Sequence, residues 1–465
     1  MGLLALLRGL AAHAVSMPGL GRAWIAAKKL EARIRGRRRG RLLQRRVVEK
    51  FFELRGATRY NVVIVCVDCM RYFNTSMAGY RRNTTPGLMS LGDHLPAVAA
   101  SPHTYSSVPS ILTGLYPHVH GAVIGGDVKN FDNVKLFRGL RRGIPTLFDV
   151  LAAVGYRVFF AAAIDLAYYP LRGRVPAVIS YDNADKLLAA AARRIREGGG
   201  RTPIAMYIHL GDLHDPITPP KEYRSYFGEP RPDAGYWRYT RCEEQHGEGF
   251  EAYRESRILL YDNALRYVDD AITRFVSMID SVLDDTILIV TADHGEEFWE
   301  HSELECRLFY DPRGVHGIGH GHNLFAEITL VPLVARLPSS RLTLVGEVAS
   351  ITDVTPTVLG EIGIKPRYDW YFDGVNLAGG RRRDVIISEA VGYGYEKKAV
   401  ITGGYKLIVS KGDGVRLIYS VRDDPFEQHP LDDRERGEAL EGVLKARLAR
   451  GYVKVHAIRR VLRGG

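Results

Sequence analysis

From residue 60 onward, short apolar runs alternate with longer amphipathic stretches. The clearest runs are Asn61–Val67, Ile204–Leu210 and Thr286–Thr291, which are rich in β-branched residues and apolar on both faces. Such runs are typical of parallel strands that helices cover on both sides. Residues 258–279 carry apolar positions at spacings of three and four, which predicts a helix. The pattern predicts an α/β fold with a large, mostly parallel central sheet and helices on both faces.

Polar groups follow each of these runs. Asp68 ends the first run, Asp212 and His214 follow the second, and Asp293 and His294 follow the third. Ligands of open α/β sheets bind beyond the carboxyl ends of the strands, so we expect these groups to share one site. Two carboxylates with an imidazole suit a divalent cation. The pattern alone is weak evidence, because an aspartate at a strand end is more often a helix cap.

Charge is distributed unevenly along the 465 residues. The net charge is +11, and residues 1–56 alone hold 14 basic against 3 acidic residues. Residues 443–465 add seven basic residues and no acidic ones, which leaves 43 basic and 50 acidic residues between these ends. An acidic body argues against a nucleic-acid groove, so we expect no nucleic-acid partner. Basic ends favour contact with an anionic surface instead.

Residues 2–34 mix apolar side chains with regularly spaced Arg and Lys. This pattern fits an interfacial amphipathic helix, and it fits a solvated basic arm equally well. No run is long and apolar enough for a confident transmembrane segment, and the charge pattern does not match a secretory signal. Four cysteines are too few for a disulfide framework, which favours a reducing compartment. We expect a cytoplasmic protein, with peripheral membrane attachment through the N-terminus.

A polar, Pro-rich loop leads into a short helix near residue 100, in the segment SPHTYSSVPSILTGLYPHVHG. Gly114 or Pro117 should end this helix. Thr104 lies near its start, where free amides and the helix dipole favour a developing anion. A hydroxyl activated by a metal would be a usable nucleophile there. The alternative is that Thr104 only caps the helix.

The chain resembles the sulfatase family of the alkaline phosphatase superfamily, in order, from about residue 58 to 435. The segments that carry the resemblance are NVVIVCVDCMR, NTTPGLMSL, SILTGLYPHVHG, IHLGDLHDPITPP, TADHGEEFWEH, GHGHNLFAEITLVPLVAR, DVTPTVLGEIGI and YKLIVSKGDGVRLIYSVRDDPFEQHPL. The resemblance implies an alkaline phosphatase-like catalytic domain over residues 58–377 and a smaller antiparallel β subdomain over 378–442. An N-terminal extension of residues 1–57 and a basic tail of residues 443–465 flank them.

The resemblance also implies roles for individual residues. It places Asp68, Asp293, His294 and Thr104 around one divalent cation, which is Mn, Mg, Ca or Zn, and it leaves room for a second cation. Thr104 takes the position of the nucleophile, His214 lies near the leaving group, and His320 contacts the substrate oxyanion. His322, Arg71 and Asp212 are expected to bind substrate. For His320 and His322 the alternative is a flexible polar loop.

Two positions depart from the family pattern. Sulfatases carry a Cys or Ser that is oxidised to formylglycine, followed by fixed Pro and Arg positions, whereas this chain has Thr104, Ser106 and Val108 there. Threonine cannot give that aldehyde, and unmodified threonine nucleophiles occur in relatives that act on phosphorus esters. Cys69 stands where many sulfatases have a second metal aspartate. Cys69 could be a thiolate ligand, but a small buried residue is the favoured interpretation.

These observations predict a metal-dependent hydrolase of phosphoric esters, phosphonates or sulfuric esters that acts through a covalent intermediate on Thr104. One alternative is a phosphoglycerol- or phosphoethanolamine-type transferase that uses the same site. The alternative from another class is a non-catalytic protein whose basic arms bind membrane or nucleic acid.

Overall fold

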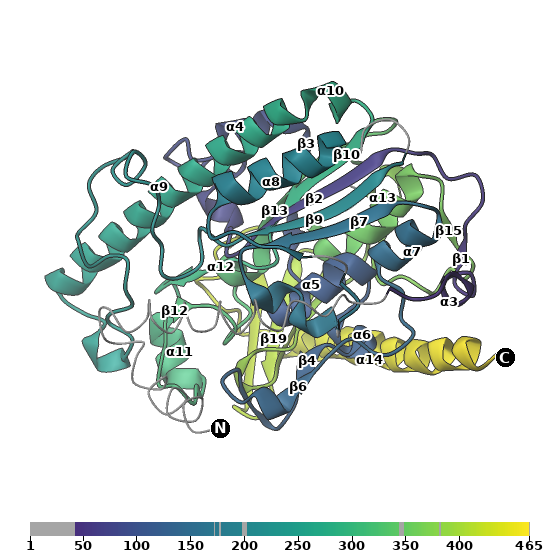
Figure 1. Cartoon of the computed structure of the whole chain (residues 1–465). Helices are drawn as coiled ribbons and strands as arrows, with labels where there is room; N and C mark the ends of the chain where they lie inside the picture. The colour runs from purple at the N-terminus through teal and green to yellow at the C-terminus, as the bar shows by residue number, and fades with distance from the viewer. Residues whose placement is uncertain are drawn as a thin grey trace, which may run out of the picture.

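The computed structural model describes residues 42–464, except 172, 176–177, 198–201, 344–347 and 381–382. The amphipathic helix expected over residues 2–34 lies outside the described residues, and so does most of the N-terminal extension. The elements of the described chain are labelled in Figure 1.

Within the described residues, the central sheet has eight strands in the order β14-β3-β13-β10-β2-β9-β7-β8. Their bounds, in that order, are Ala349–Ser350, Asp93–Val98, Leu330–Arg336, Thr286–Thr291, Asn61–Val67, Ile204–Leu210, Arg157–Ala162 and Val178–Ile179. Neighbouring strands are parallel except for β13, which is antiparallel to both β10 and β3. The mostly parallel sheet predicted from the apolar runs is confirmed, and β2, β9 and β10 have the predicted bounds.

Helices cover both faces of this sheet, as predicted (Figure 1). Helices α4 (Pro86–Leu91), α8 (Ala184–Glu197), α9 (Glu248–Met278) and α10 (Asp280–Leu283) lie on one face. Helices α5 (Thr104–Thr113), α7 (Leu147–Ala153) and α13 (Val354–Glu361) lie on the other. The short helices α6 (Pro117–His120), α11 (Ser302–Leu308) and α12 (Ala326–Thr329) belong to the connections. The apolar strands are buried between these layers, so their polar ends are fixed in position.

A second, antiparallel sheet lies toward the C-terminus, as predicted. It contains β16 (Ile386–Glu389), β18 (Lys397–Thr402), β19 (Tyr405–Ser410) and β20 (Val415–Ser420) in sequence order. Two-stranded pairs complete the described fold: β1 (Phe52–Glu53) with β15 (Lys365–Pro366), β4 (Val123–Ile124) with β6 (Phe137–Arg138), β5 (Val128–Asn130) with β17 (Tyr393–Tyr395), and β11 (Glu297–Phe298) with β12 (Ile318–Gly319).

Both ends of the described chain differ from the predicted domain boundaries. The residues expected to form a basic tail belong to helix α14 (Arg434–Arg463), which packs against the small sheet and α6. Leu444 and Ile458 on this helix are buried, so the helix has an apolar face that its basic composition conceals. At the other end, α3 (Arg45–Val48) and β1 pack onto the body of the protein, so residues 42–57 are part of the fold.

A disulfide joins Cys242 and Cys306, which are 64 residues apart in the sequence. Cysteine number alone did not predict this pair. Disulfides form in oxidising compartments or in the cytoplasm of hyperthermophiles, so the pair counts against a simple reducing compartment. The cytoplasmic location therefore stays a prediction. Over the same described residues, we find no helix that combines the length and hydropathy needed to cross a membrane.

Candidate active site

Asp68 and Asp293 lie side by side at one edge of the central sheet because they follow neighbouring strands. β2 and β10 are parallel, with Cys66 opposite Thr291, so both chains leave the sheet at the same level. His294 Nε2 lies 3.3 Å from Asp68 Oδ1 and 3.5 Å from Asp293 Oδ2. All three side chains are fully buried. The structure thus brings together side chains that are more than two hundred positions apart in the sequence.

Thr104 completes this group from the opposite side. It is the first residue of α5, a fully buried helix of ten residues whose dipole favours negative charge at this end. The Thr104 hydroxyl lies 3.2 Å from His294 Nε2 and donates a hydrogen bond of 3.4 Å to Asp68 Oδ2. Oxygen and nitrogen ligands of one divalent cation lie at similar separations, because their bonds to the metal are about 2.0–2.6 Å long.

The residues present fit a divalent cation. Both carboxylate oxygens of Asp293 are buried without a hydrogen-bond partner. Burying a carboxylate without a compensating partner costs free energy of folding, and a bound cation would remove that cost. Burial and the neighbouring charge of Asp68 raise the pKa of Asp293. For Asp68 the balance is reversed: burial acts to raise its pKa, but the hydrogen bond from His209 and the charge of His294 lower it well below its usual range.

His209 is a site residue that the sequence reasoning missed. It lies on β9, the other neighbour of β2, and its Nε2 is 3.1 Å from Asp68 Oδ2 and 4.0 Å from Asp293 Oδ2. Its Nδ1 contacts the Tyr207 hydroxyl at 3.1 Å. The available signal was a single imidazole one position before the end of an otherwise apolar strand. Together with Asp68 and Asp293, His209 forms a buried group that could hold a metal ion.

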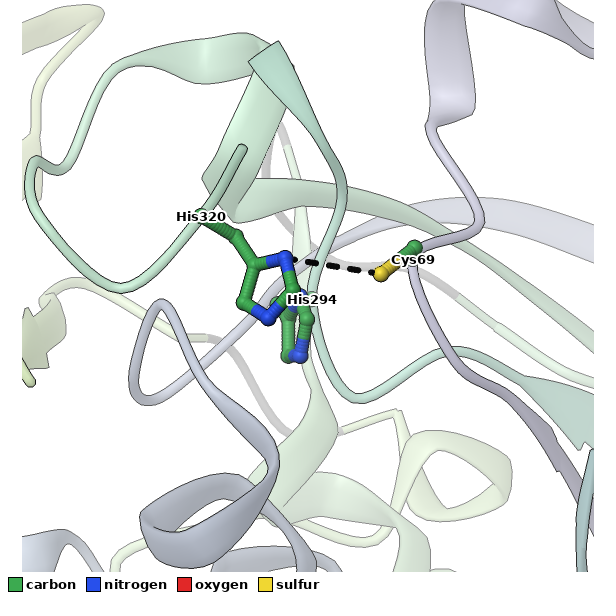
Figure 2. A group of neighbouring side chains, drawn as sticks. All are labelled: Cys69, His294 and His320. Carbon is green, nitrogen blue, oxygen red and sulfur yellow. Dashed lines mark hydrogen bonds between the residues drawn. The ribbon is translucent and has the colours of Figure 1, made fainter. Parts of the chain in front are cut away.

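His214 and His320 lie over the same group. The His320 ring is 4.3 Å from the ring of His294 and 5.2 Å from the ring of His214, between centroids. Figure 2 shows His320 directly against His294. The Nδ1 of His214 contacts the carbonyl of Asp215 at 2.8 Å, so Nε2 is the ring nitrogen that could contact a substrate. The structure therefore places both predicted catalytic histidines beside the carboxylates.

The sulfatase family model matches residues 60–364, which is more than half of the chain and includes the residues of this site. The chain belongs to the sulfatase family. This confirms the resemblance drawn from the ordered motifs, and it makes the protein an ester hydrolase of that family. Sulfatases generally use a divalent metal, which agrees with the metal-binding groups of this chain.

Solved sulfatase structures share the fold at low identity. A putative sulfatase from Bacteroides fragilis is 15% identical, with a TM-score of 0.65, and the match covers 87% of this chain and 98% of that one. The phosphonate monoester hydrolase of Agrobacterium radiobacter is 17% identical, with a TM-score of 0.62, over 85% and 96%. The protein BT4656, solved with its substrate D-glucosamine-2-N,6-O-disulfate, is 15% identical, with a TM-score of 0.61, over 85% and 98%. No curated protein matches the chain significantly.

The three residues expected to bind substrate contact other residues of the protein. His322 Nε2 contacts Glu297 at 3.1 Å and Glu305 at 3.3 Å. Arg71 pairs with Glu300 and stacks over the Phe298 ring. Asp212 accepts a hydrogen bond of 3.2 Å from the first amide of α8, and burial raises its pKa to about 6. These internal partners use some of the polar atoms of the three side chains, and substrate contacts of these residues stay predictions.

Glu297, His301 and Glu327 form a buried group in the fold, and the pairing of His301 with Glu327 gives a pH-dependent prediction. His301 Nδ1 contacts Glu327 at 2.7 Å. Burial acts to lower the pKa of His301, but the charge of Glu327 and the hydrogen bond to it raise this pKa to about 10. Because the raised value exceeds the ordinary one, the pair stabilises the fold fully below about pH 6.5 and loses this effect as the pH rises toward 10.

We expect the free energy of unfolding to fall between pH 7 and 10 more steeply in the wild-type protein than in His301→Gln. Linkage limits the difference in slope to about 1.4 kcal/mol per pH unit. Urea unfolding at several pH values measures both slopes. Parallel profiles for the two proteins would show that His301 is not held protonated in the folded state.

Proposed function

We propose that this sulfatase-family protein hydrolyses phosphorus esters, as phosphate mono- or diesters or phosphonates, with Thr104 as the nucleophile. The observation that carries the proposal is the position of the Thr104 hydroxyl, within 3.4 Å of both Asp68 and His294 at the start of a buried helix. A cap-only role for Thr104 does not explain these contacts, because its hydroxyl is directed at the carboxylate and imidazole and not at the amides of α5.

In the first step, different side chains would bind the metal, attack phosphorus and accept the proton. Asp68, Asp293 and His294 would hold a divalent cation, which when bound lowers the pKa of the Thr104 hydroxyl and neutralises charge on the substrate oxygens. Thr104 Oγ1 forms a bond to phosphorus as the bond from phosphorus to the leaving oxygen breaks. Asp68 Oδ2 accepts the hydrogen bond of the Thr104 hydroxyl, so it is positioned to receive the proton.

His214 is suited to protonate the leaving oxygen. Burial acts to lower its pKa, but the charge of Asp68 raises it above the ordinary value, which favours the protonated imidazole. After the leaving group departs with this proton, the neutral imidazole can accept a proton from water. The water oxygen then bonds to phosphorus, the bond to Thr104 Oγ1 breaks, and the proton that Asp68 received returns to Oγ1, which restores the free hydroxyl. A transferase would use an acceptor hydroxyl in place of water.

Hydrolysis of sulfuric esters is the second candidate, because the chain belongs to a family named for that reaction. A threonine at position 104 cannot form the aldehyde on which sulfatases depend, and this favours phosphorus substrates. Attachment to anionic membrane through the basic N-terminal residues is a further proposal, supported by the charge distribution alone. A cytoplasmic location is another proposal, supported by the small number of cysteines.

A substrate panel tests the proposed function. The full-length protein, loaded in turn with Mn, Zn, Mg and Ca, is assayed with nitrophenyl phosphate, bis-nitrophenyl phosphate, nitrophenyl phenylphosphonate and nitrophenyl sulfate. We expect kcat/KM for the best phosphorus ester to exceed that for the sulfate by more than about tenfold, or more than about 1.4 kcal/mol in transition-state stabilisation. Faster hydrolysis of the sulfate would overturn the substrate choice. Turnover that requires an added alcohol would identify a transferase.

A further inference from the structure

A free thiol lies inside the active-site cluster. Cys69 follows Asp68, is fully buried, and adopts a positive φ of 61° that is uncommon for residues other than glycine. The Tyr261 hydroxyl holds this turn, because it donates to the Cys69 carbonyl at 2.7 Å and accepts from the Arg71 amide at 2.9 Å. The sulfur consequently points toward His320, as Figure 2 shows.

Cys69 and two imidazoles have the spacing of metal ligands. Cys69 Sγ lies 3.6 Å from His320 Nδ1, and the donor atoms of Cys69, His294 and His320 all lie within 4.8 Å of one another. Tetrahedral zinc with bonds of about 2.3 Å to sulfur and about 2.0–2.1 Å to nitrogen separates the two ligands by about 3.6 Å. The Nδ1 of His294 contacts the Gly295 carbonyl at 2.8 Å, so its Nε2 lone pair is available to a metal.

The surroundings supply a second, independent indication of a cation. Glu296 is buried, and its Oε1 has no hydrogen-bond partner. Its Oε2 accepts from His320 Nδ1 at 3.0 Å, a contact that a metal bound to this nitrogen would replace. The adjacent Asp293 carboxylate has no hydrogen-bond partner on either oxygen, and His294 Nε2 approaches its Oδ2 at 3.5 Å. Three carboxylates, counting Asp68, therefore meet in a buried region around the thiol and the two imidazoles. Buried carboxylate oxygens without hydrogen-bond partners favour a bound positive ion.

We propose that Cys69, His294 and His320 form a cation site with one thiolate and two imidazoles, which selects zinc-like metals over magnesium and calcium. Thiolate ligands favour zinc and cobalt, whereas magnesium and calcium favour an all-oxygen shell. Binding replaces the sulfur–hydrogen bond with a sulfur–metal bond and releases one proton to solvent. Because His294 Nε2 has one lone pair, this site and the one formed by Asp68 and Asp293 would share a single cation. The inference rests on the proposed function for the presence of a metal, but not for the substrate.

Cobalt spectroscopy tests the sulfur ligand without any assay of activity. The protein is stripped with a chelator and titrated with Co²⁺ alone, and the near-ultraviolet absorption that thiolate-to-cobalt charge transfer produces is recorded. We expect this band in the wild-type protein and in Cys66→Ala, which removes the other free thiol. We expect it to be lost in Cys69→Ser. Cys242 and Cys306 are paired in a disulfide and do not compete for the metal.

Metal preference gives a second readout. Competition titrations should show that Cys69→Asp lowers the ratio of zinc to magnesium affinity by more than about tenfold relative to the wild-type protein. A wild-type cobalt complex without the charge-transfer band would overturn the proposal whatever the folding of the variants, and so would a band that persists in Cys69→Ser. Phosphorus-ester turnover by the manganese-loaded protein would in that case leave the proposed function standing.

Discussion

Replacing Thr104 with alanine is expected to lower kcat for the best phosphorus ester by at least about 10⁴-fold, the scale seen when a nucleophile is removed from an active site. The structure places no second hydroxyl in contact with both Asp68 and His294 within its described residues. Metal affinity should change far less, because two carboxylates and His294 remain. Steady-state kinetics and metal titration of the same preparation measure the two effects separately.

Thr104→Ser is the matched control. It keeps an attacking hydroxyl at the start of α5, so it should retain much more activity than Thr104→Ala. Circular dichroism of both variants shows whether the helix has formed. If Thr104→Ala kept turnover within about tenfold of wild type, less than about 1.4 kcal/mol of transition-state stabilisation could be assigned to this residue. The nucleophile assignment would then fail.

Asp293→Asn is expected to abolish activity and yet to stabilise the metal-free protein. The buried Asp293 carboxylate has no hydrogen-bond partner and faces the charge of Asp68, which raises its pKa. A neutral amide removes that repulsion and lowers the cost of burying the group. A buried polar group without a partner costs about 1–3 kcal/mol, so we expect a gain of this order in the free energy of unfolding. The wild-type protein should instead gain stability from metal, by about 2.7 kcal/mol at a concentration one hundred times the dissociation constant.

Denaturant unfolding with and without metal measures both effects. Asp262→Asn provides the contrast, because Asp262 is equally buried but is paired with Arg82 at 2.7 Å and accepts from Asn74 at 2.8 Å. That variant should lose stability under both conditions and keep the stabilisation by metal. An Asp293→Asn protein that metal still stabilises as much as the wild type would remove Asp293 from the ligand set.

The sequence predicted those parts of the fold that local patterns determine. The bounds of β2, β9 and β10 follow from β-branched apolar runs that end at polar residues, because such runs are typical of buried strands. Helix α9 begins at Glu248, ten residues before the predicted start. Apolar periodicity missed these turns because only Phe250 and Tyr253 among their buried side chains are apolar or aromatic. The basic tail predicted over residues 443–465 belongs to helix α14. Its helical pattern is difficult to recognise because many of its residues are charged and its buried apolar residues are few.

The site was partly predictable for a similar reason. Asp68, Asp293 and His294 could be grouped because parallel strands deliver their carboxyl ends to one edge. His209 was missed because it lies inside a strand and not after it. The direction of the Cys69 thiol depends on a positive φ, which no sequence pattern specified. The disulfide between Cys242 and Cys306 links distant loops, and cysteine spacing does not reveal such a pairing.

A crystal structure of the metal-loaded protein with vanadate shows whether Thr104 and the cation act at one phosphorus centre. We expect continuous density between Thr104 Oγ1 and vanadium, with a cation within about 2.6 Å of Asp68, Asp293 and His294. Vanadate bound away from Thr104, or a cation that these three side chains do not ligate, would contradict this expectation.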